Sequence, residues 1–281
     1  AVGYAPFSRK TDPATIHGDP DIILYPESTE LDDLVITAGV FEASDEKKAV
    51  ALRPLDIVTT AGATADIPGV MNTLPGTQTV GEKGRLFIRG GESRESRNFI
   101  DGIFVGEPYA LSPVNIPARM RFSPFLFSGT TFSTGGYSAE YGQALSGTLI
   151  LKTDDEPLQT QTDLSLMTVG ASVAHTQKWE SNSVFLESAY SDLSPYFHVI
   201  PQKAGWKRAP RSWQNTFMFR QKLRDQGQIR VFYNNDFSDM KIDQPLPHDI
   251  SRRMSVGLSN RYHYVNTNIE QNLKENWFFY G

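Results

Sequence analysis

The sequence predicts an α+β domain with a small mixed sheet and short helices, followed by antiparallel strands of a transmembrane β-barrel. Three observations lead to this fold class. Short apolar runs separated by glycines fill residues 45–155. From about residue 156 onward, apolar and polar residues alternate with a period of two, which is typical of strands. Short turns and long connections alternate between these strands, as they do in outer-membrane barrels.

Residues 1–44 precede both regions and are rich in proline, a residue that interrupts helices and central strands. The clearest apolar run among them is Leu34–Thr37. We therefore expect most of this segment to be an extended tether.

The region 45–155 contains short strands and at least one helix. Apolar runs that predict short strands lie at 85–89, 98–105 and 148–152. A helix is predicted over residues 65–74. Asp66 can cap this helix and Pro68 suits its first turn, and Pro75-Gly76 then stops it.

Long strands begin after residue 155. Residues 214–224 are an example, because Phe217 and Phe219 share one parity while Arg220 and Lys222 take the other. Each such strand has one apolar and one polar face. About seven strands are predicted, the last at 276–281. Because hydrocarbon does not tolerate unpaired strand edges, we expect the 281 residues to be part of a longer chain.

The connections between these strands differ in length. Short turns are predicted at Gly170 and at residues 180–182, 225–227 and 274–275. Long connections are predicted at about 193–211 and 239–254. If the first strand runs outward, both long connections lie on the outside, whereas a soluble β-sandwich or lipocalin-like barrel has no reason to group them.

Composition excludes several classes of protein and site. The balance of 27 basic against 32 acidic residues, without a block of like charges, argues against a nucleic-acid partner. The absence of cysteine excludes disulfides, thiolate metal sites and thiol nucleophiles. The five histidines are widely scattered, and no phosphate-binding glycine loop or nucleophile elbow is present. We therefore expect no metal site, no cofactor and no enzymatic activity.

Four motifs occur in order across about 70 residues. They are Leu86–Gly91, Phe99–Ile103, Tyr137–Gly142 and Gly147–Thr153. Their succession resembles the plug signature of TonB-dependent outer-membrane receptors: a strand ending in Arg-Gly, a strand ending in Asp-Gly, then a Tyr-Gly, Gly, strand, Thr pattern.

The resemblance covers roughly residues 34–281 and implies a plug inside a barrel of about 22 strands. On this basis residues 1–44 are an N-terminal segment that begins with the tail of a preceding β-sandwich, 45–155 the plug domain and 156–281 the first part of the barrel. It also implies a location in the bacterial outer membrane, with the plug and the N-terminal segment facing the periplasm.

The run Asp32–Ala38 resembles the TonB box, which the energy-transducing protein TonB grips. An extended, β-branched strand can add to a sheet edge of a partner through main-chain hydrogen bonds. We therefore predict that the C-terminal domain of TonB binds here, through Asp33, Leu34, Val35, Ile36, Thr37 and Ala38. The alternative is a first plug strand or a piece of linker.

Arg89 matches an arginine that in this family helps to latch the plug to the barrel by pairing with barrel carboxylates. The family's second latch arginine would fall at Ser128-Gly129-Thr130, which contains no arginine. Arg119 or Arg121 is the expected substitute.

Two further segments correspond to plug apices, where relatives meet their ligand. They are the turn at 92–97 and the tip at 106–109, and the candidate ligand-facing residues are Arg94, Glu95, Ser96, Glu107 and Tyr109. Tyr109 offers an aromatic contact and Arg94 suits an anionic group. The alternative is that these are solvated loop residues.

The resemblance implies import of a scarce solute with energy from the inner membrane. A ferric siderophore is the first expectation, and other metal chelates, glycans or peptides are the alternatives; outer-membrane lipid is the expected surrounding. A passive barrel or a surface binding protein would have similar strands but needs no plug. For a soluble β-rich binding protein, we would expect the sheet to close within these 281 residues.

Overall fold

The computed structural model describes residues 49–280, apart from 64, 81–83, 113–116, 154–156, 203–204, 225–226, 247–248 and 275–276. Residues 43–281 form one compact unit. The predicted TonB-box-like residues 33–38 lie outside the described residues.

The first part of the unit, residues 49–153, is called the plug below. Its five-stranded sheet has the order β1 (Ala49–Leu52), β6 (Phe127–Ser133), β7 (Gly147–Thr153), β4 (Ser96–Ile100), β5 (Ile103–Phe104). Strands β4 and β7 are parallel and the other neighbours are antiparallel. A separate two-stranded ladder joins β2 (Thr77–Gln78) to β3 (Phe87–Ile88). The small mixed sheet is as predicted.

Short helices complete the plug. They are α1 (Pro54–Thr59), α2 (Ile67–Met71) and the 3₁₀ turns η2 (Ser93–Glu95) and η3 (Pro124–Leu126). Helix α2 begins directly after Asp66, has Pro68 in its first turn and is followed by Gly76 at φ +87°, as its sequence predicts. Its apolar residues are buried against the sheet, and together they form the core of the plug.

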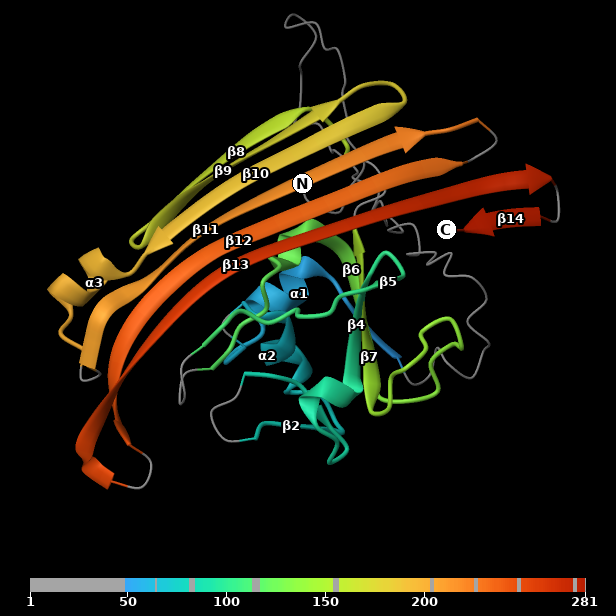
Figure 1. Cartoon of the computed structure of the whole chain (residues 1–281). Helices are drawn as coiled ribbons and strands as arrows, with labels where there is room; N and C mark the ends of the chain where they lie inside the picture. Colours follow the sequence, from blue (N-terminus) through green and yellow to red (C-terminus); the bar gives the residue numbers. More distant parts are fainter. Residues whose placement is uncertain are drawn as a thin grey trace, which may run out of the picture. The chain divides into compact units, whose positions relative to one another are not determined.

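The second part, residues 161–280, is one antiparallel sheet, called the wall below. Its strands pair in chain order: β8 (Gln161–Met167), β9 (Gly170–Lys178), β10 (Asn182–Asp192), β11 (Gly205–Lys222), β12 (Gln228–Leu246), β13 (Asp249–Lys274) and β14 (Trp277–Tyr280). Figure 1 shows these strands running side by side across one side of the plug. Among the described residues, the predicted number of wall strands, seven, is confirmed.

The wall connections partly match the prediction. A tight hairpin joins β8 to β9, and a Cβ at Gly170 would collide with the carbonyl oxygen of Tyr190. The connection after β10 is long and contains α3 (Ser194–Val199), although β11 already begins at Gly205.

The predicted loop at 239–254 is wrong. Strand β12 continues to Leu246 and β13 begins at Asp249, so this segment is an extended hairpin. Beyond Phe237, charged residues replace the apolar ones on one face of β12, as at Lys241 and Asp243. The backbone ladder nevertheless continues through Lys241↔Gly257 and Asp243↔Ser255.

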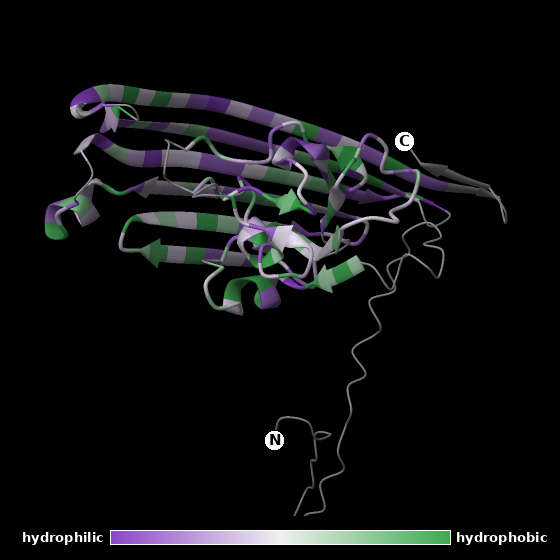
Figure 2. Cartoon of the chain, turned by 90° about the horizontal axis from the view of Figure 1, so that it is seen from below, coloured by the Kyte–Doolittle hydropathy of each residue, from purple (hydrophilic) through white to green (hydrophobic). Residues whose placement is uncertain are grey.

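The two faces of the wall differ in polarity. Side chains exposed on one face are large and apolar, among them Leu164, Val173, Leu186, Trp213 and Val265. The opposite face lies against the plug and carries the buried polar side chains Thr216, Asn234, Asp236, Asn266 and Asn268. Figure 2 shows the resulting alternation of hydrophilic and hydrophobic bands along the strands. Such alternation is typical of strands with lipid on one side and a polar interior on the other.

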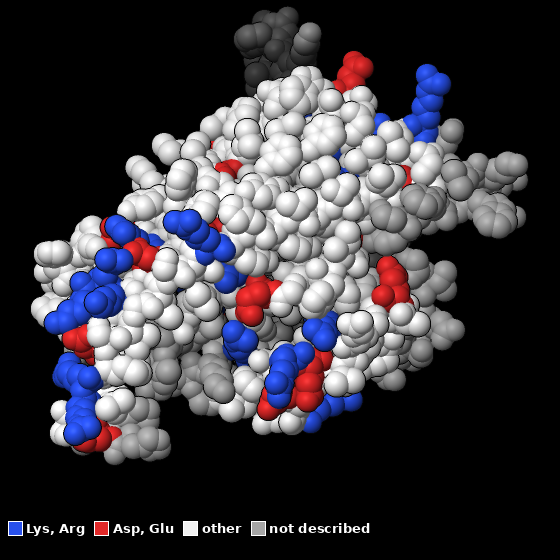
Figure 3. All heavy atoms as spheres, in the orientation of Figure 1, with Lys and Arg blue, Asp and Glu red and all other residues white. Residues whose placement is uncertain are grey.

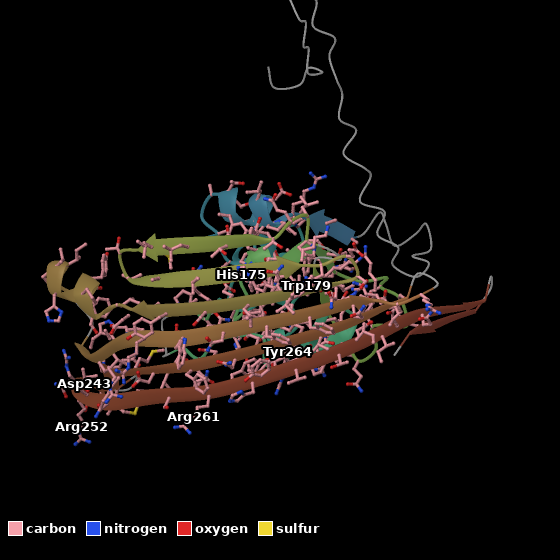
Figure 4. All side chains as sticks on the ribbon, turned by 90° about the horizontal axis from the view of Figure 1, so that it is seen from above. His175, Trp179, Asp243, Arg252, Arg261 and Tyr264 are labelled. Atoms are coloured by element: carbon pink, nitrogen blue, oxygen red, sulfur yellow. The ribbon has the colours of Figure 1, made fainter. Side chains whose placement is uncertain are left out.

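Polar groups mark one end of the apolar face. The strand register aligns Tyr190, Trp213, Phe237 and Arg261 in one row. Two residues further along, Arg211 forms an ion pair with Asp239. Figure 3 shows Lys, Arg, Asp and Glu gathered at this end, beside a broad uncharged area, and Figure 4 shows Asp243 and Arg252 there and Arg261 pointing away from the sheet. An aromatic row followed by charges is the pattern of a membrane interface.

None of the helices in the described part of the chain is long and apolar enough to cross a membrane.

Neighbouring residues of β9 test which face meets lipid. We expect Val173→Arg, on the apolar face, to lower the free energy of unfolding in a bilayer by about 2–4 kcal/mol at mid-depth and less near the interface. Ser172→Arg, on the opposite face, should cost clearly less. The measurement is denaturant unfolding of the full-length protein in lipid vesicles, and equal losses for both variants would contradict the assignment of the faces.

Candidate functional site

The site is the junction between the plug and the polar face of the wall. Its centre is Arg121, whose side chain is only 2% exposed. Arg121 Nη1 lies 2.5 Å from Oδ2 of Asp236 on β12. The guanidinium also lies 4.3 Å from the ring centroid of Tyr262 and donates from Nη2 to Asn260 Oδ1 at 3.5 Å, both on β13. One plug side chain therefore contacts two wall strands through charge, hydrogen bonding and a cation–π contact.

A third strand joins the same arginine through its backbone. Gln214 on β11 donates its side-chain amide to the carbonyl oxygen of Arg121. Asn260 Nδ2 donates to Asp236 Oδ2 at 3.0 Å, so the carboxylate is held by two partners. A buried ion pair needs such additional hydrogen bonds to offset the cost of removing its charges from water.

The plug holds Arg121 on a segment made of residues 108–112 and 117–121, which is called the arm below. A β-bridge joins Tyr109 to Met120, and Arg121 N donates to the carbonyl oxygen of Pro108 at 2.9 Å. The arm is tied to the rest of the plug at two points. Met120 N donates to Asp66 Oδ1 at 3.0 Å, and Leu86 N donates to the Tyr109 hydroxyl oxygen at 3.3 Å.

Burial controls the ionisation of both groups that tie the arm. It raises the pKa of the Asp66 carboxyl above its usual range, although the hydrogen bond from Met120 opposes this effect. Burial also raises the pKa of Tyr109 to about 12, so this hydroxyl is neutral at physiological pH. Both groups serve as hydrogen-bond acceptors inside the plug.

A second junction forms around Asp101. Its carboxylate accepts hydrogen bonds from the backbone and hydroxyl of Thr153, at 2.9 and 2.7 Å. Arg230 on β12 approaches the same carboxylate at 3.5 Å and pairs with Glu270 at 2.8 Å. The Asp101 carbonyl oxygen accepts from Asn268 Nδ2 at 3.1 Å. Two of the sequence motifs, those that end in Asp-Gly and in Thr, thus meet at one wall contact.

The Arg-Gly and Asp-Gly pairs share one backbone geometry. Asp101 and Gly102 have φ +46° and +78°, and the two residues connect β4 to β5. Arg89 and Gly90 have φ +48° and +81°, and Gly91 N donates to Ile88 O across them. Two consecutive positive φ angles define a type I′ turn, in which glycine is favoured because it lacks a Cβ. Both motifs are therefore tight turns.

Aromatic packing joins the same two parts. Phe122 on the plug lies edge-on to Phe232 of β12 and Tyr264 of β13, with ring centroids 6.0 Å apart in each case. Phe232 and Tyr264 are also 6.0 Å apart, so the three rings form a triangle. Phe122 follows Arg121 directly, and the apolar contact therefore lies beside the ion pair.

The sequence itself matches no protein-family model and no curated protein. Solved structures do resemble this one. The ferric enterobactin receptor PfeA from Pseudomonas aeruginosa, as a mutant, is 13% identical with a TM-score of 0.50, over 82% of this chain and 40% of the receptor. The ferric-catecholate import receptor Fiu from E. coli K12 is 12% identical with a TM-score of 0.51, over 81% of this chain and 36% of Fiu. The copper transporter OprC is 11% identical with a TM-score of 0.54, over 80% of this chain and 35% of OprC.

The fold is that of TonB-dependent outer-membrane receptors. The predicted resemblance is confirmed at this level. The chain spans between a third and two fifths of the length of these structures. The match covers 80–82% of this chain.

The structure distinguishes between the two arginines predicted as latches. Arg121 makes the buried contact with the wall that was expected of a substitute latch residue. Arg89 is exposed, and its side chain lies beside Gly76 and Gly135. Nothing in the described part of the chain tests its latch role, which stays a prediction.

The predicted apex residues fall into two groups. Tyr109 and Ser96 are only 3% and 8% exposed in this structure, and their contact with a ligand stays a prediction. Arg94 is exposed and pairs with Glu92 at 2.7 Å. Glu95 accepts a hydrogen bond from Ser146. For Arg94, Glu95 and the exposed Glu107, ligand contact stays a prediction.

The wall partners of the plug were not identified from the sequence. The alternation of the sequence places Asp236 and Arg230 on the polar face of a strand and gives no further signal. Pairing Asp236 with Arg121 requires contact across 115 residues of chain. The Asp-Gly motif pointed to Asp101 as a turn residue but carried no signal that its carbonyl oxygen meets β13.

The described residues contain no group of three or more His, Cys, Asp or Glu side chains placed to hold a metal ion. The junction holds the plug against the wall. Paired charges, amides on carbonyl oxygens and stacked rings hold one folded part against another.

Asp66 offers a test of the arm. Asp66→Asn keeps an acceptor for Met120 N–H and removes the buried charge, whereas Asp66→Ala leaves that donor unpaired. We expect Asp66→Ala to lower the free energy of unfolding by about 1–3 kcal/mol and Asp66→Asn to equal or exceed wild type at pH 7.

The pH dependence has a definite sign. Because the folded pKa of Asp66 is raised, this group stabilises the fold at acid pH and that contribution is lost as pH rises above 3.8 towards the raised value. The advantage of Asp66→Asn should grow over this window. Calorimetry of the purified full-length protein at several pH values measures it, and an advantage that shrinks with pH would contradict the assignment.

The Arg121 junction makes a second prediction. Arg121→Ala leaves Asp236 buried without its charge partner, and we expect the free energy of opening of the plug to fall by about 3–5 kcal/mol. Arg94→Ala breaks an exposed pair and should cost less than about 1 kcal/mol. Amide hydrogen exchange in β4 and β7 reports the opening, and similar exchange in both variants would contradict a central role for Arg121.

Proposed function

We propose that this chain is the plug and the first part of the barrel of an outer-membrane receptor that imports a small solute with energy supplied through TonB. The observation that carries the proposal is the buried contact of Arg121 with Asp236. It fastens the α+β part of the chain to the polar face of a sheet whose other face is apolar. A passive pore has no use for such a part, because a plug blocks diffusion.

The proposal places the apolar face of the wall in outer-membrane lipid. The row Tyr190, Trp213 and Phe237, followed by Arg211 and Asp239, then lies at one membrane interface. Helix α3 and the extended β12–β13 hairpin lie beyond this row and form the extracellular side. The short turns at the opposite ends of the strands face the periplasm, as does the N-terminal segment.

A metal chelate is the solute class that we propose first. The similar structures include a ferric enterobactin receptor, a ferric-catecholate import receptor and a copper transporter. Each of these names concerns the relative and supports only the class for this chain. Glycans and peptides are the further candidates, and the solute would first meet the exposed plug residues Arg94 and Glu107.

Energy must reach the plug from outside the outer membrane, because this chain contains no nucleotide-binding motif. The run Asp33–Ala38 suits this role as an extended strand for the C-terminal domain of TonB. A pull on this strand acts on the N-terminal end of the plug and opposes the contacts of Arg121 and Asp101. The alternative is a passive barrel or a surface binding protein, which would leave these residues without a partner.

The test is a pull-down of the full-length protein by the C-terminal domain of TonB. We expect wild type to bind and Ile36→Pro to lose binding, because proline removes a main-chain donor needed for strand addition. Ile22→Pro, a proline in another part of the N-terminal segment, should bind like wild type.

Binding that fails for Ile36→Pro alone would support coupling through this strand. The absence of binding by wild type, with ferric and copper chelates present, would contradict energy coupling and favour the passive barrel. Equal loss with Ile22→Pro would contradict the assignment of residues 33–38.

A further inference from the structure

The contacts between plug and wall described above are unevenly distributed. Arg121, Asp101 and Phe122 all reach β11, β12 or β13. Against β8, β9 and β10, the plug instead borders a cavity of about 630 Å³. A cavity of this size has room for about 20 water molecules at their liquid volume. The polar and aromatic contacts thus lie along one part of the wall, and a cavity lies beside another part, where Phe185 of β10 packs against the hydrophobic core.

The cavity lies between η3 and four wall strands. The plug contributes Ser123, Phe125 and Leu126, and the segment before β8 contributes Pro157, Leu158 and Gln159. Phe125 is 62% exposed and Leu158 is 95% exposed, so neither side chain is held in a packed core. The boundary of the cavity on the plug side therefore consists of a short 3₁₀ turn and a connecting segment.

The wall side of the cavity carries charged and hydroxyl side chains beside the apolar Leu164, Phe185 and Met218. Ala174 on β9 pairs in register with Asp163 on β8 and Glu187 on β10, and all three side chains line the cavity. The small residues Ser172 and Ser165 occupy the neighbouring row. The lining thus combines two carboxylates and several hydroxyls with these three apolar side chains.

Arg220 of β11 lines the same cavity. The acidic groups outnumber this guanidinium two to one among the lining residues. The two carboxylates that flank Ala174 favour a solute that donates hydrogen bonds or carries positive charge where it passes this row.

We propose that the cavity between η3 and β8–β11 is the passage for the solute, and that Asp163 and Glu187 select for hydrogen-bond donors and positive charge along it. This inference rests on the proposed import function. The plug stays fastened to β12 and β13 during passage, and the segments 123–126 and 157–159 move aside. Opening this side leaves the Arg121–Asp236 pair intact, whereas opening the other side would expose both charges unpaired.

Cysteine labelling tests the passage, since this chain contains no native cysteine. Single cysteines replace Ala174 in the cavity, Asn234 on the fastened part of the polar face, and Val173 on the apolar face of β9. The probes are two membrane-impermeant methanethiosulfonates, one with a trimethylammonium group and one with a sulfonate. They are added to cells carrying the full-length protein, with or without a protonophore.

We expect Ala174→Cys to react at least ten times faster than Asn234→Cys and Val173→Cys, and faster in respiring cells than with the protonophore. The cationic probe should react several-fold faster than the anionic probe at Ala174→Cys. Glu187→Gln in the same background should reduce this preference, because it removes one carboxylate from the row.

Three results would contradict the assignment of the cavity as the passage for the solute. The first is a slow reaction at Ala174→Cys both with and without the protonophore. The second is a reaction that is faster in respiring cells at Asn234→Cys instead of at Ala174→Cys. The third is an equal rate at Ala174→Cys with and without the protonophore. None of these three results changes the outcome of the pull-down by TonB. The proposed import function is therefore tested by that separate experiment. Equal rates for the two probes would overturn the selectivity assigned to Asp163 and Glu187.

Discussion

The pairing of buried charges between plug and wall is the constraint on which the rest of the structure depends. Arg121 and Asp236 are both almost fully buried, and each would be costly to leave alone. The cation–π contact with Tyr262 and the amide of Asn260 provide the remaining partners. A buried pair of this kind contributes little net stability compared with an apolar contact, but it specifies one arrangement because alternatives leave a charge unpaired.

The same constraint explains the construction of the plug. Its arm presents Arg121 only while Met120 is held by Asp66 and Tyr109 by Leu86. The Asp101 turn adds a second fastening, in which main-chain carbonyl oxygens of the plug meet amides of β13. These contacts lie on β11–β13, while β8–β10 border a cavity. A pull on the plug therefore meets unequal resistance around the wall, which favours movement of one side.

Local chemistry made much of the fold predictable. The Arg89-Gly90 and Asp101-Gly102 pairs are turns because glycine accepts positive φ, and the alternation of polarity separates the two faces of the wall. The alternation failed at Lys241 and Asp243, where charge beyond the apolar band resembles a loop. Partners distant in sequence were not predictable. Tyr109 lies in a loop yet is buried by the arm, and Asp236 differs from other polar wall residues only through its contact with Arg121.

The most direct test of this arrangement is a charge exchange between Arg121 and Asp236. Arg121→Asp and Asp236→Arg each place like charges together, and both single variants should make the plug of the full-length protein sensitive to protease in outer-membrane vesicles. The double variant should regain much of the wild-type resistance, because opposite charges again face each other across the junction. A double variant as sensitive as the sum of the single changes would show that the two residues do not hold the plug to the wall.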